Sequence, residues 1–204
     1  MAMDADIKSL DNLREAVKAR LSEKRYLHTL GVEACATKLG EIFLHDKVFE
    51  LRAAALLHDI AKELPVTLLR DLYQSSIFSH KKCVDAALHS FVGALLIERD
   101  FPKYATKEII SAVANHTLGS PDMTLFDEII FISDYIEDGR TYESCISVRN
   151  TLFQELSSRT SKEEKHFALR RAIYSSLCYT LDALNKRGVK PDDTSVLTKN
   201  AYSS

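Results

Sequence analysis

The feature that most constrains this fold is a polar pair set in an apolar stretch. His58 and Asp59 follow the run Ala-Ala-Ala-Leu-Leu over residues 53–57, and Ile60 and Ala61 continue it. A buried imidazole or carboxylate costs free energy unless a hydrogen bond, a charge or a metal ion satisfies it. Whatever fold forms must therefore bring other polar groups to this pair.

Four more polar residues lie in similarly apolar helical surroundings. They are His28, His89, His116 and Asp134. Imidazole and carboxylate together suit iron, manganese or zinc better than magnesium or calcium, which prefer oxygen-only shells. The six residues therefore predict a site for two divalent metal ions, with Asp59 able to bridge them. Such a pair in a helical pocket is typical of enzymes that hydrolyse phosphate esters or anhydrides.

Each of these residues alone has an ordinary explanation. A single histidine in an amphipathic helix is more often a surface residue or a satisfied core residue than a ligand. We assign His45, His80 and His166 to that class, and Asp134 could face solvent. His45 and Asp46 form a second His-Asp pair, but they lie at a polar helix end where we expect no site. The metal prediction rests on the conjunction of six such residues.

Fixed cations accompany the predicted ligands. Lys62 follows His58 by four residues and Asp59 by three, and Arg25 precedes His28 by three. Helical periodicity places residues three or four apart on one face, so both cations should reach the same pocket. The net charge of −2 gives no general reason to bind nucleic acid or an anionic membrane. An anionic substrate would depend on these local cations or on metals.

Glycine and proline are scarce, with six and four in 204 residues. That scarcity favours long helices over strands and tight turns. Apolar spacing predicts about eight helices, including ranges 48–63, 82–99 and 125–137, in one compact all-α domain over residues 1–190. The N-caps expected from sequence are Ser22, Thr106 and Thr124, the last in a capping box with Asp127. Residues 191–204 are expected to form a polar, frayed tail.

The cysteines and the N-terminus indicate a cytoplasmic protein. None of the four cysteines forms a CxxC pair, and their spacing matches no zinc ribbon, so we expect reduced thiols. The first residues lack the pattern of a signal peptide, and no apolar run approaches the ~18 residues of a membrane span. Apolar positions on several helices could serve a homodimer as well as a core.

The ordered set of histidines and aspartates resembles the HD-domain phosphohydrolase superfamily. Its flanks narrow the resemblance to the YqeK family over roughly residues 15–187. The segments that carry it are Arg25-Tyr-Leu-His28-Thr-Leu-Gly31-Val32, Leu57-His58-Asp59-Ile-Ala61-Lys62, His89-Ser-Phe-Val92-Gly93-Ala94, Asn115-His116-Thr117 and Ser133-Asp134-Tyr-Ile-Glu137-Asp-Gly139-Arg140. The resemblance implies an all-α HD-domain bundle. It also implies an enzyme that splits diadenosine tetraphosphate (Ap4A) symmetrically into two ADP.

The resemblance also implies roles for particular residues. One metal ion would bind His28, His58, Asp59 and Asp134, and the second would bind Asp59, His89 and His116. The family favours iron, with manganese or zinc as alternatives, and a hydroxide bridging the ions would attack a central phosphorus. Asp59 and Lys62 would be catalytic. The residues expected to contact substrate are Arg25, Lys62, His89, Thr117 and Arg140.

Departures from the family pattern, chiefly in one loop, leave alternatives open. Residues 118–120 read Leu-Gly-Ser where the family tends to have Thr-Gly-Arg, so a basic residue is missing near the nucleotide. Arg25 could instead form a surface ion pair with Glu23 or Glu41. The chain could therefore be a different HD-domain enzyme, such as a nucleoside monophosphate or deoxynucleotide phosphatase. It could also be a non-catalytic nucleotide-binding sensor. Purely structural metal is disfavoured, because structural zinc sites usually close with cysteines.

Overall fold

The structure, a computed structural model, describes residues 2–80 and 83–203. Within these residues it is all-α, as predicted, and contains no strand. The α-helices are α1 (Ala2–Lys18), α2 (Glu23–Phe43), α3 (Val48–Leu57), α4 (Val66–Gln74), α5 (Leu88–Asp100), α6 (Lys107–Asn115), α7 (Leu125–Ile136), α8 (Glu143–Ser158), α9 (Lys162–Lys186) and α10 (Asp193–Ala201). Three short 3₁₀ helices, at 45–47, 85–87 and 102–104, join some of them.

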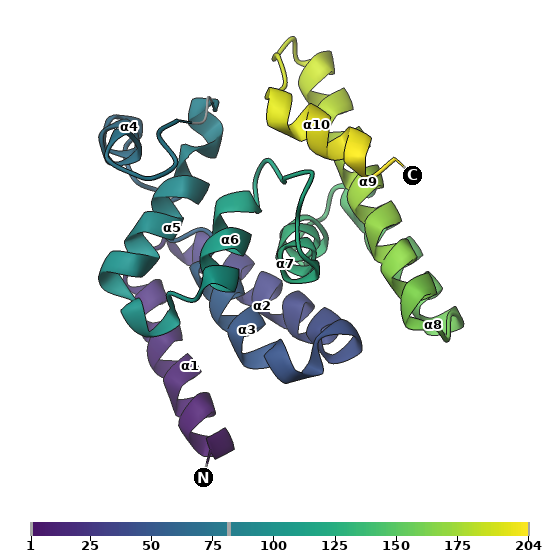
Figure 1. The fold of residues 1–204 in the computed structure, drawn as a ribbon, viewed down its shortest axis with the longest axis horizontal. Coiled ribbons are helices and arrows are strands. Elements are labelled where there is room, and N and C mark those ends of the chain that lie inside the picture. The colour runs from purple at the N-terminus through teal and green to yellow at the C-terminus, as the bar shows by residue number, and fades with distance from the viewer. Residues whose placement is uncertain (1, 81–82, 204) are drawn as a thin grey trace.

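In Figure 1, α2, α3, α5, α6 and α7 gather in the middle of the molecule, α4 lies at its edge against α5, and α8 and α9 form a hairpin at another side. α2 packs on α3 and α7, α6 packs on α5 and α7, and α10 lies on α9. The largest fully buried side chains include Leu39 of α2, Leu57 of α3, and Ile130 and Ile132 of α7. The core therefore lies where α2, α3 and α7 meet, and it brackets the predicted ligands on those helices.

Three predicted N-caps are confirmed, and they fix where the helices that carry predicted ligands begin. Ser22 accepts a hydrogen bond from the Arg25 amide at the start of α2, and Thr106 accepts one from the Ile109 amide at the start of α6. Thr124 and Asp127 form the predicted capping box of α7, with both reciprocal bonds present. Side-chain caps satisfy amides that the first helical turn leaves without partners.

The helix predicted over residues 48–63 is shorter than expected. α3 ends at Leu57, and three-residue turns follow, including a bond of 2.9 Å from the Lys62 amide to the Asp59 carbonyl. The prediction of one continuous helix through His58 and Lys62 is therefore wrong. In turns of this 3₁₀ type, side chains three apart eclipse one another, so Asp59 and Lys62 still share a side.

The helix predicted over 82–99 also begins late. α5 starts at Leu88 after the 3₁₀ helix 85–87, while residue 82 lies outside the described residues. His89 consequently lies in the first turn of α5 and not in the middle of a helix. Like His58, it is held at a helix end.

The C-terminal segment is ordered helix, so the expectation of a frayed tail is wrong. Asp192 caps α10 by accepting from the Thr194 amide at 2.9 Å. Beyond α10, the Tyr202 hydroxyl donates to Glu128 of α7 at 2.8 Å. Ser195 also donates to the Leu118 carbonyl at 3.2 Å, which ties α10 to the loop after α6. This extra helix raises the count to ten in the described residues, compared with the eight or so predicted. The domain division at residue 190 stays a prediction.

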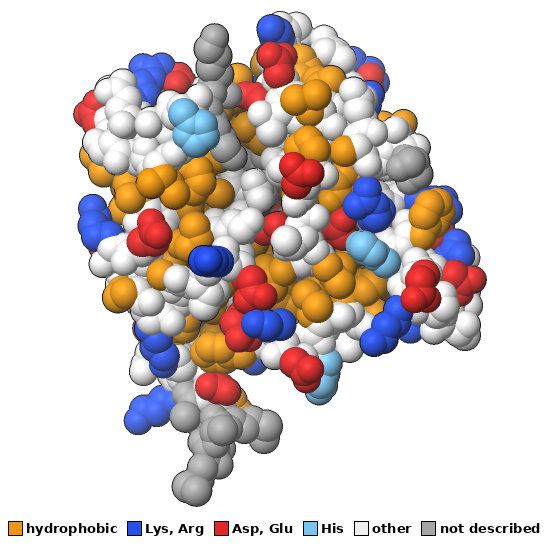
Figure 2. Space-filling view, viewed as in Figure 1, with side chains coloured by type: hydrophobic (Ala, Val, Ile, Leu, Met, Phe, Trp, Pro, Cys, Tyr) orange, Lys and Arg blue, Asp and Glu red, His pale blue; other side chains and the backbone are white. Residues whose placement is uncertain are grey.

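Charges of both signs are interspersed over the face drawn in Figure 2, with apolar patches between them. This pattern agrees with the small net charge of −2. Among the helices described, none is both long enough and apolar enough to cross a membrane.

Candidate metal centre

The structure brings together all six residues that the sequence analysis assigned as metal ligands. His28 comes from α2, and Asp134 comes from the last turns of α7. His58 is the C-cap of α3, and His116 is the C-cap of α6. We call this set the Asp59 centre: His28, His58, Asp59, His89, His116 and Asp134. Residues more than a hundred positions apart thus meet because four helix ends and one helix face converge.

Asp59 lies in the middle of this centre, and its two oxygens face different partners. Oδ2 lies 3.4 Å from Nε2 of His58 and 3.9 Å from Nε2 of His28. Oδ1 lies 3.4 Å from Nε2 of both His89 and His116. A carboxylate with an imidazole pair on each oxygen has the arrangement that bridging two cations requires.

Asp134 completes the side of the centre that contains His28 and His58. Its Oδ1 lies 3.0 Å from Nε2 of His28 and 4.0 Å from Nε2 of His58. Ligand atoms of His28, His58 and Asp134 lie within 4.8 Å of one another, and so do those of His58, Asp59 and His116. Each group could hold a metal ion, but His58 has one free Nε2 lone pair and can serve only one ion at a time.

Backbone carbonyls fix which ring nitrogen carries the proton in two of the histidines. Nδ1 of His58 lies 2.6 Å from the Ala55 carbonyl, and Nδ1 of His116 lies 2.7 Å from the Val113 carbonyl. A carbonyl oxygen can only accept, so Nδ1 must donate in both cases. In the neutral rings, Nε2 then carries a lone pair directed at Asp59. Metal-binding histidines usually have this arrangement, in which one ring nitrogen donates to an oxygen and the other binds the ion.

Glu137 fixes the proton of His28 in the same way, a role that the sequence pattern did not indicate. The Glu137 carboxylate is buried and lies 3.1 Å from Nδ1 of His28. The Gly139 amide donates to its other oxygen at 2.6 Å, and a Cβ on Gly31 would collide with that oxygen. The available signal was its position three residues after Asp134, which places a second carboxylate on one helical face.

This centre contains more hydrogen-bond acceptors than donors. Within the described residues, Nε2 of His28, Nε2 of His58 and Oδ1 of Asp59 are buried without a hydrogen-bond partner. Buried polar atoms of this kind normally have partners, and here lone pairs face carboxylate oxygens. A bound cation would reconcile them, and mixed imidazole and carboxylate ligands suit first-row divalent metals. The residues present therefore fit a metal site.

Protonation within the centre follows from burial and from neighbouring charge. Burial lowers the pKa of His28, but the neighbouring carboxylates of Asp134 and Glu137 outweigh burial and raise that pKa to about 8. Burial, followed by His116 and Lys62, lowers the pKa of His89 to about 2, so His89 stays neutral. A proton on His28 would compete with a metal ion for the same lone pair.

Asp59 stays ionised in spite of its burial. Burial alone would raise the pKa of its carboxyl, but His58 and His116, when their rings are protonated, hold that pKa well below its usual range. Nη1 of Arg25 also donates to Oδ2 of Asp59 at 2.8 Å. Arg25 therefore pairs with Asp59 and not with Glu23 or Glu41, the surface partners considered from sequence.

The other predicted substrate contacts lie at the rim of the centre. Nη2 of Arg140 donates to Oδ1 of Asp134 at 2.6 Å. Nζ of Lys62 lies 3.1 Å from Nε2 of His89, and burial lowers the pKa of Lys62. The Thr117 hydroxyl lies 3.0 Å from Nε2 of His89 and 3.0 Å from Nε2 of His116. With Arg25, three cations and one hydroxyl thus border the ligand cluster.

The remaining histidines lie in other surroundings. His45 is exposed beside Glu41, and His80 contacts the Ile77 carbonyl at the surface. His166 lies 2.7 Å from Glu128, far along the chain from the centre. None of the three belongs to either group of ligand atoms found in the described residues.

Comparison with known proteins identifies the family. The profile of the HD domain matches residues 25–139, more than half of the chain. The chain belongs to the HD domain family. The match begins at Arg25 and ends beyond Asp134, so it spans the whole Asp59 centre. Members of this family bind divalent metals, which agrees with the geometry above.

Two relatives carry the same functional name. A protein of Bacillus subtilis, named symmetrical bis(5'-nucleosyl)-tetraphosphatase, is 33% identical over 146 residues, covering 69% of this chain and 76% of that protein. A protein of Halalkalibacterium halodurans with the same name is 31% identical over 185 residues, covering 87% of this chain and 89% of that protein. The chain therefore spans most of the length of these relatives.

The fold also matches a solved structure. A crystal structure from Clostridium acetobutylicum, described as a predicted HD superfamily hydrolase involved in NAD metabolism, superposes with a TM-score of 0.77. It is 24% identical, and the match covers 94% of this chain and 95% of that one. At this identity the likeness establishes the shared fold.

Proposed function

We propose that this chain hydrolyses diadenosine tetraphosphate symmetrically to two ADP at two divalent metal ions held by the Asp59 centre. The observation that carries the proposal is the position of Asp59, whose two oxygens face separate imidazole pairs at 3.4–3.9 Å. Relatives named symmetrical bis(5'-nucleosyl)-tetraphosphatase, at 28–33% identity, support the substrate and the position of cleavage.

In this proposal His28, His58, Asp59 and Asp134 hold one ion, and Asp59, His89 and His116 hold the second. When bound, such ions supply Lewis acidity, which polarises phosphoryl oxygens and makes water acidic enough to react near neutral pH. We propose iron as the metal used in the cell, with manganese and zinc as alternatives, because all three accept mixed imidazole and carboxylate ligands.

The other residues of the site bind and orient the phosphates. Arg25, Lys62 and Arg140 place three cationic groups beside the centre, where the tetraphosphate oxygens carry most of the substrate's charge. The Thr117 hydroxyl can donate one further hydrogen bond. The partly buried surroundings lower the local dielectric, which strengthens each of these attractions. ADP leaves as a stabilised phosphate anion, so the reaction needs no strong general acid.

The test is product identification with metal-defined protein. The chain is purified without oxygen, its metal content is measured, and it is incubated with Ap4A together with Fe²⁺, Mn²⁺ or Zn²⁺. We expect two ADP per Ap4A by chromatography and, in ¹⁸O-labelled water, one labelled β-phosphate per pair of ADP. ATP plus AMP would contradict the symmetrical reaction. Phosphate released only from nucleoside monophosphates would favour the phosphatase alternative, and tight binding without turnover would favour a sensor.

The variant Lys62→Ala distinguishes a residue that contacts phosphate from one that supports metal binding. Lys62→Ala removes a cation that contacts His89 but supplies no ligand to the predicted metals. We expect slower turnover with unchanged metal content, measured by rate assay and elemental analysis. Loss of metal in this variant would make Lys62 a structural residue.

We also propose that the protein works in the cytoplasm. All four cysteines are free thiols, and a reducing compartment keeps thiols in that state. The homodimer considered from sequence stays a prediction, and sedimentation of the purified chain would test it.

A further inference from the structure

A groove of about 700 Å³ opens beside the Asp59 centre. One wall is the start of α2, and the other is the segment between α7 and α8. His28 and Arg140 both line it, so the groove is continuous with the metal centre. Its volume falls in the range of sites that bind small molecules.

Two large apolar side chains in this groove are unusually exposed. Tyr142 is 70% exposed and Leu27 is 60% exposed. Within the described part of the chain, no hydrogen bond, ion pair or ring contact engages the Tyr142 side chain. An exposed aromatic ring beside phosphate-binding cations has the chemistry of a stacking platform, because every nucleobase has a π face.

The groove offers both cations and exposed apolar side chains, and the charged Glu23 and Lys24 line it as well. Arg25 and Arg140 contact Asp59 and Asp134 of the metal centre, so the cations lie at its inner end. Tyr142 and Leu27 present exposed side chains on the same groove. A nucleotide has parts that match both, with charged phosphates at one end and an apolar, stackable base at the other.

We propose that Tyr142 and Leu27 form the platform for one nucleobase of the substrate, with Tyr142 stacking on the base. This inference rests on the proposed function, since it takes the phosphates to lie on Arg25 and Arg140. Stacking is tolerant of base identity, so the platform should favour nucleotides over base-free polyphosphates more than it favours adenine over guanine.

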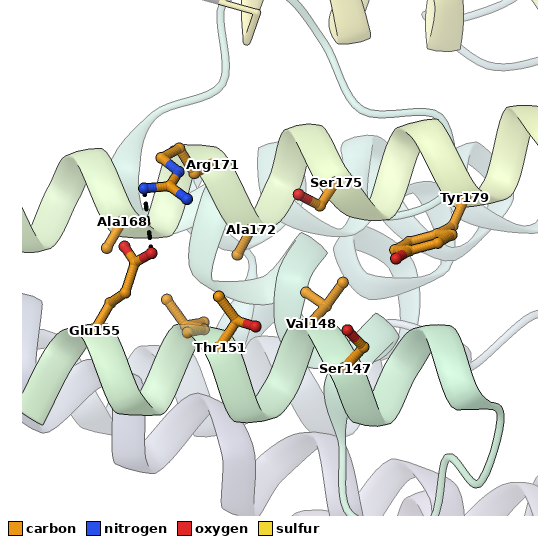
Figure 3. Close-up of a pocket in the computed structure, with 10 residues that line it drawn as sticks. Ser147, Val148, Thr151, Glu155, Ala168, Arg171, Ala172, Ser175 and Tyr179 are labelled. Carbon is orange, nitrogen blue, oxygen red and sulfur yellow. Dashed lines mark ion pairs between the residues drawn. The ribbon is translucent and has the colours of Figure 1, made fainter.

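A second groove, between α8 and α9, provides the comparison that the test needs. It contains Tyr179 at one end and the Glu155–Arg171 ion pair at the other, and Figure 3 shows both. None of the Asp59 centre residues lines it, and the cation that it offers is already paired at 3.2 Å. Tyr179 is thus an exposed groove tyrosine without a neighbouring phosphate site.

The chain contains no tryptophan, so one introduced tryptophan gives an unambiguous signal. The variant Tyr142→Trp should show saturable fluorescence quenching by ADP in Mn²⁺-loaded protein and no comparable change with inorganic pyrophosphate. Tyr179→Trp, the matched control, should respond to neither. The proposal is overturned if ADP leaves the fluorescence of Tyr142→Trp unchanged, if pyrophosphate acts equally, or if both variants respond alike.

Kinetics provide a second, independent measurement. Tyr142→Ala should raise the KM for Ap4A by about tenfold while kcat changes by less than about threefold. Tyr142→Phe should retain the wild-type KM, because the ring and not the hydroxyl stacks, and Leu27→Ala should have a smaller effect. An unchanged KM in Tyr142→Ala, or equal damage in Tyr142→Phe, would overturn the assignment. If the wild type does not split Ap4A, the proposed function fails, and the ADP titration still decides the platform.

Discussion

Asp59 and Glu128 are both buried carboxylates, but the groups around them differ in kind. The Glu128 side chain is 1% exposed, and donors surround it: His166 at 2.7 Å, Arg170 at 3.0 Å and the Tyr202 hydroxyl at 2.8 Å. The Asp59 side chain is 4% exposed, and four imidazoles surround it, at least two of which direct lone pairs toward it.

The difference separates a structural cluster from a ligand site. The chain satisfies Glu128 with its own donors, so that cluster is complete and joins α7 to α9 and to Tyr202. Asp59 keeps an oxygen with no hydrogen-bond partner in the described residues, despite Arg25 on the other oxygen. A surplus of buried acceptors requires a cation, whereas a matched set of donors and acceptors requires nothing further.

The largest expected effect comes from neutralising Asp59. Asp59→Asn keeps the shape, removes the charge and adds an amide donor for the imidazole lone pairs. We expect loss of at least one metal ion per chain and a fall in Ap4A hydrolysis of about 1,000-fold or more. The metal-free variant should unfold within about 1 kcal/mol of metal-free wild type, since Arg25 is partly exposed. Elemental analysis, rate assays and urea unfolding would measure these, and full activity would refute the dinuclear site.

The opposite result is expected at Glu128. Glu128→Gln removes the charge that accepts hydrogen bonds from Arg170, His166 and Tyr202, and hydrogen bonds to a charged group contribute about 1.5–3 kcal/mol each, so even with Arg170 and His166 partly exposed we expect a loss of about 2 kcal/mol of unfolding free energy. Metal content and turnover of the folded protein should be unchanged. Glu155→Gln, which breaks the more exposed pair with Arg171, is the matched control and should cost less than about 1 kcal/mol. Metal loss in Glu128→Gln would contradict the assignment of the Glu128 cluster as purely structural.

The variant Gly31→Ala tests whether metal binding depends on the contact between Glu137 and His28. A Cβ at residue 31 would overlap the Glu137 oxygen, so Gly31→Ala should move that carboxylate away from His28. Removing such a supporting partner typically lowers metal affinity by about 10–100-fold. Competition with a chromogenic chelator would measure the affinity. Gly188→Ala, where a Cβ would meet nothing, tests for a general effect of alanine, although its positive φ adds local strain.

The sequence predicted one of these clusters and not the other, for a physical reason. His58 and Asp59 stand out because their own neighbours are apolar, which is a local signal. The bond between Glu128 and Tyr202 joins residues 74 positions apart, and that between His28 and Glu137 joins residues 109 apart. Periodicity reports which face of a helix is apolar, but it does not report which donor will meet which acceptor.

The sequence predicted the starts of three helices correctly but not the end of α3, for a similar reason. Ser22, Thr106 and Thr124 were recognised because a cap acts on amides two or three residues away. The end of α3 at Leu57 was missed because the apolar pattern continues through Ala61, while the backbone changes to three-residue turns. That change serves the burial of His58 and Asp59, which depends on α2, α5, α6 and α7 packed around them.

The variant Tyr202→Phe measures how much free energy of unfolding one hydrogen-bond donor contributes to the cluster around Glu128. Tyr202→Phe removes the hydroxyl from Glu128 and leaves the ring, which packs on Arg170 with 4.0 Å between the guanidinium carbon and the ring centroid. We expect a loss of about 1 kcal/mol in unfolding free energy, typical of one buried hydrogen bond, and unchanged metal content. Urea unfolding gives the first and elemental analysis the second. A loss as large as that in Glu128→Gln would show that the hydroxyl, and not the ion pairs, dominates the cluster.

The smallest effect is expected at the second His-Asp pair. This pair tests whether metal binding depends on burial of the dipeptide or only on its two residue types. His45 and Asp46 repeat the dipeptide of the metal centre, but the His45 side chain is 76% exposed and its partner is Glu41 at 2.7 Å. Water already solvates these groups, so they have no unmet lone pairs to offer an ion. The double change His45→Ala and Asp46→Asn should leave metal content and turnover unchanged and alter the unfolding free energy by less than about 0.5 kcal/mol. Loss of metal from this variant would mean that the dipeptide itself, and not its buried surroundings, recruits the ion.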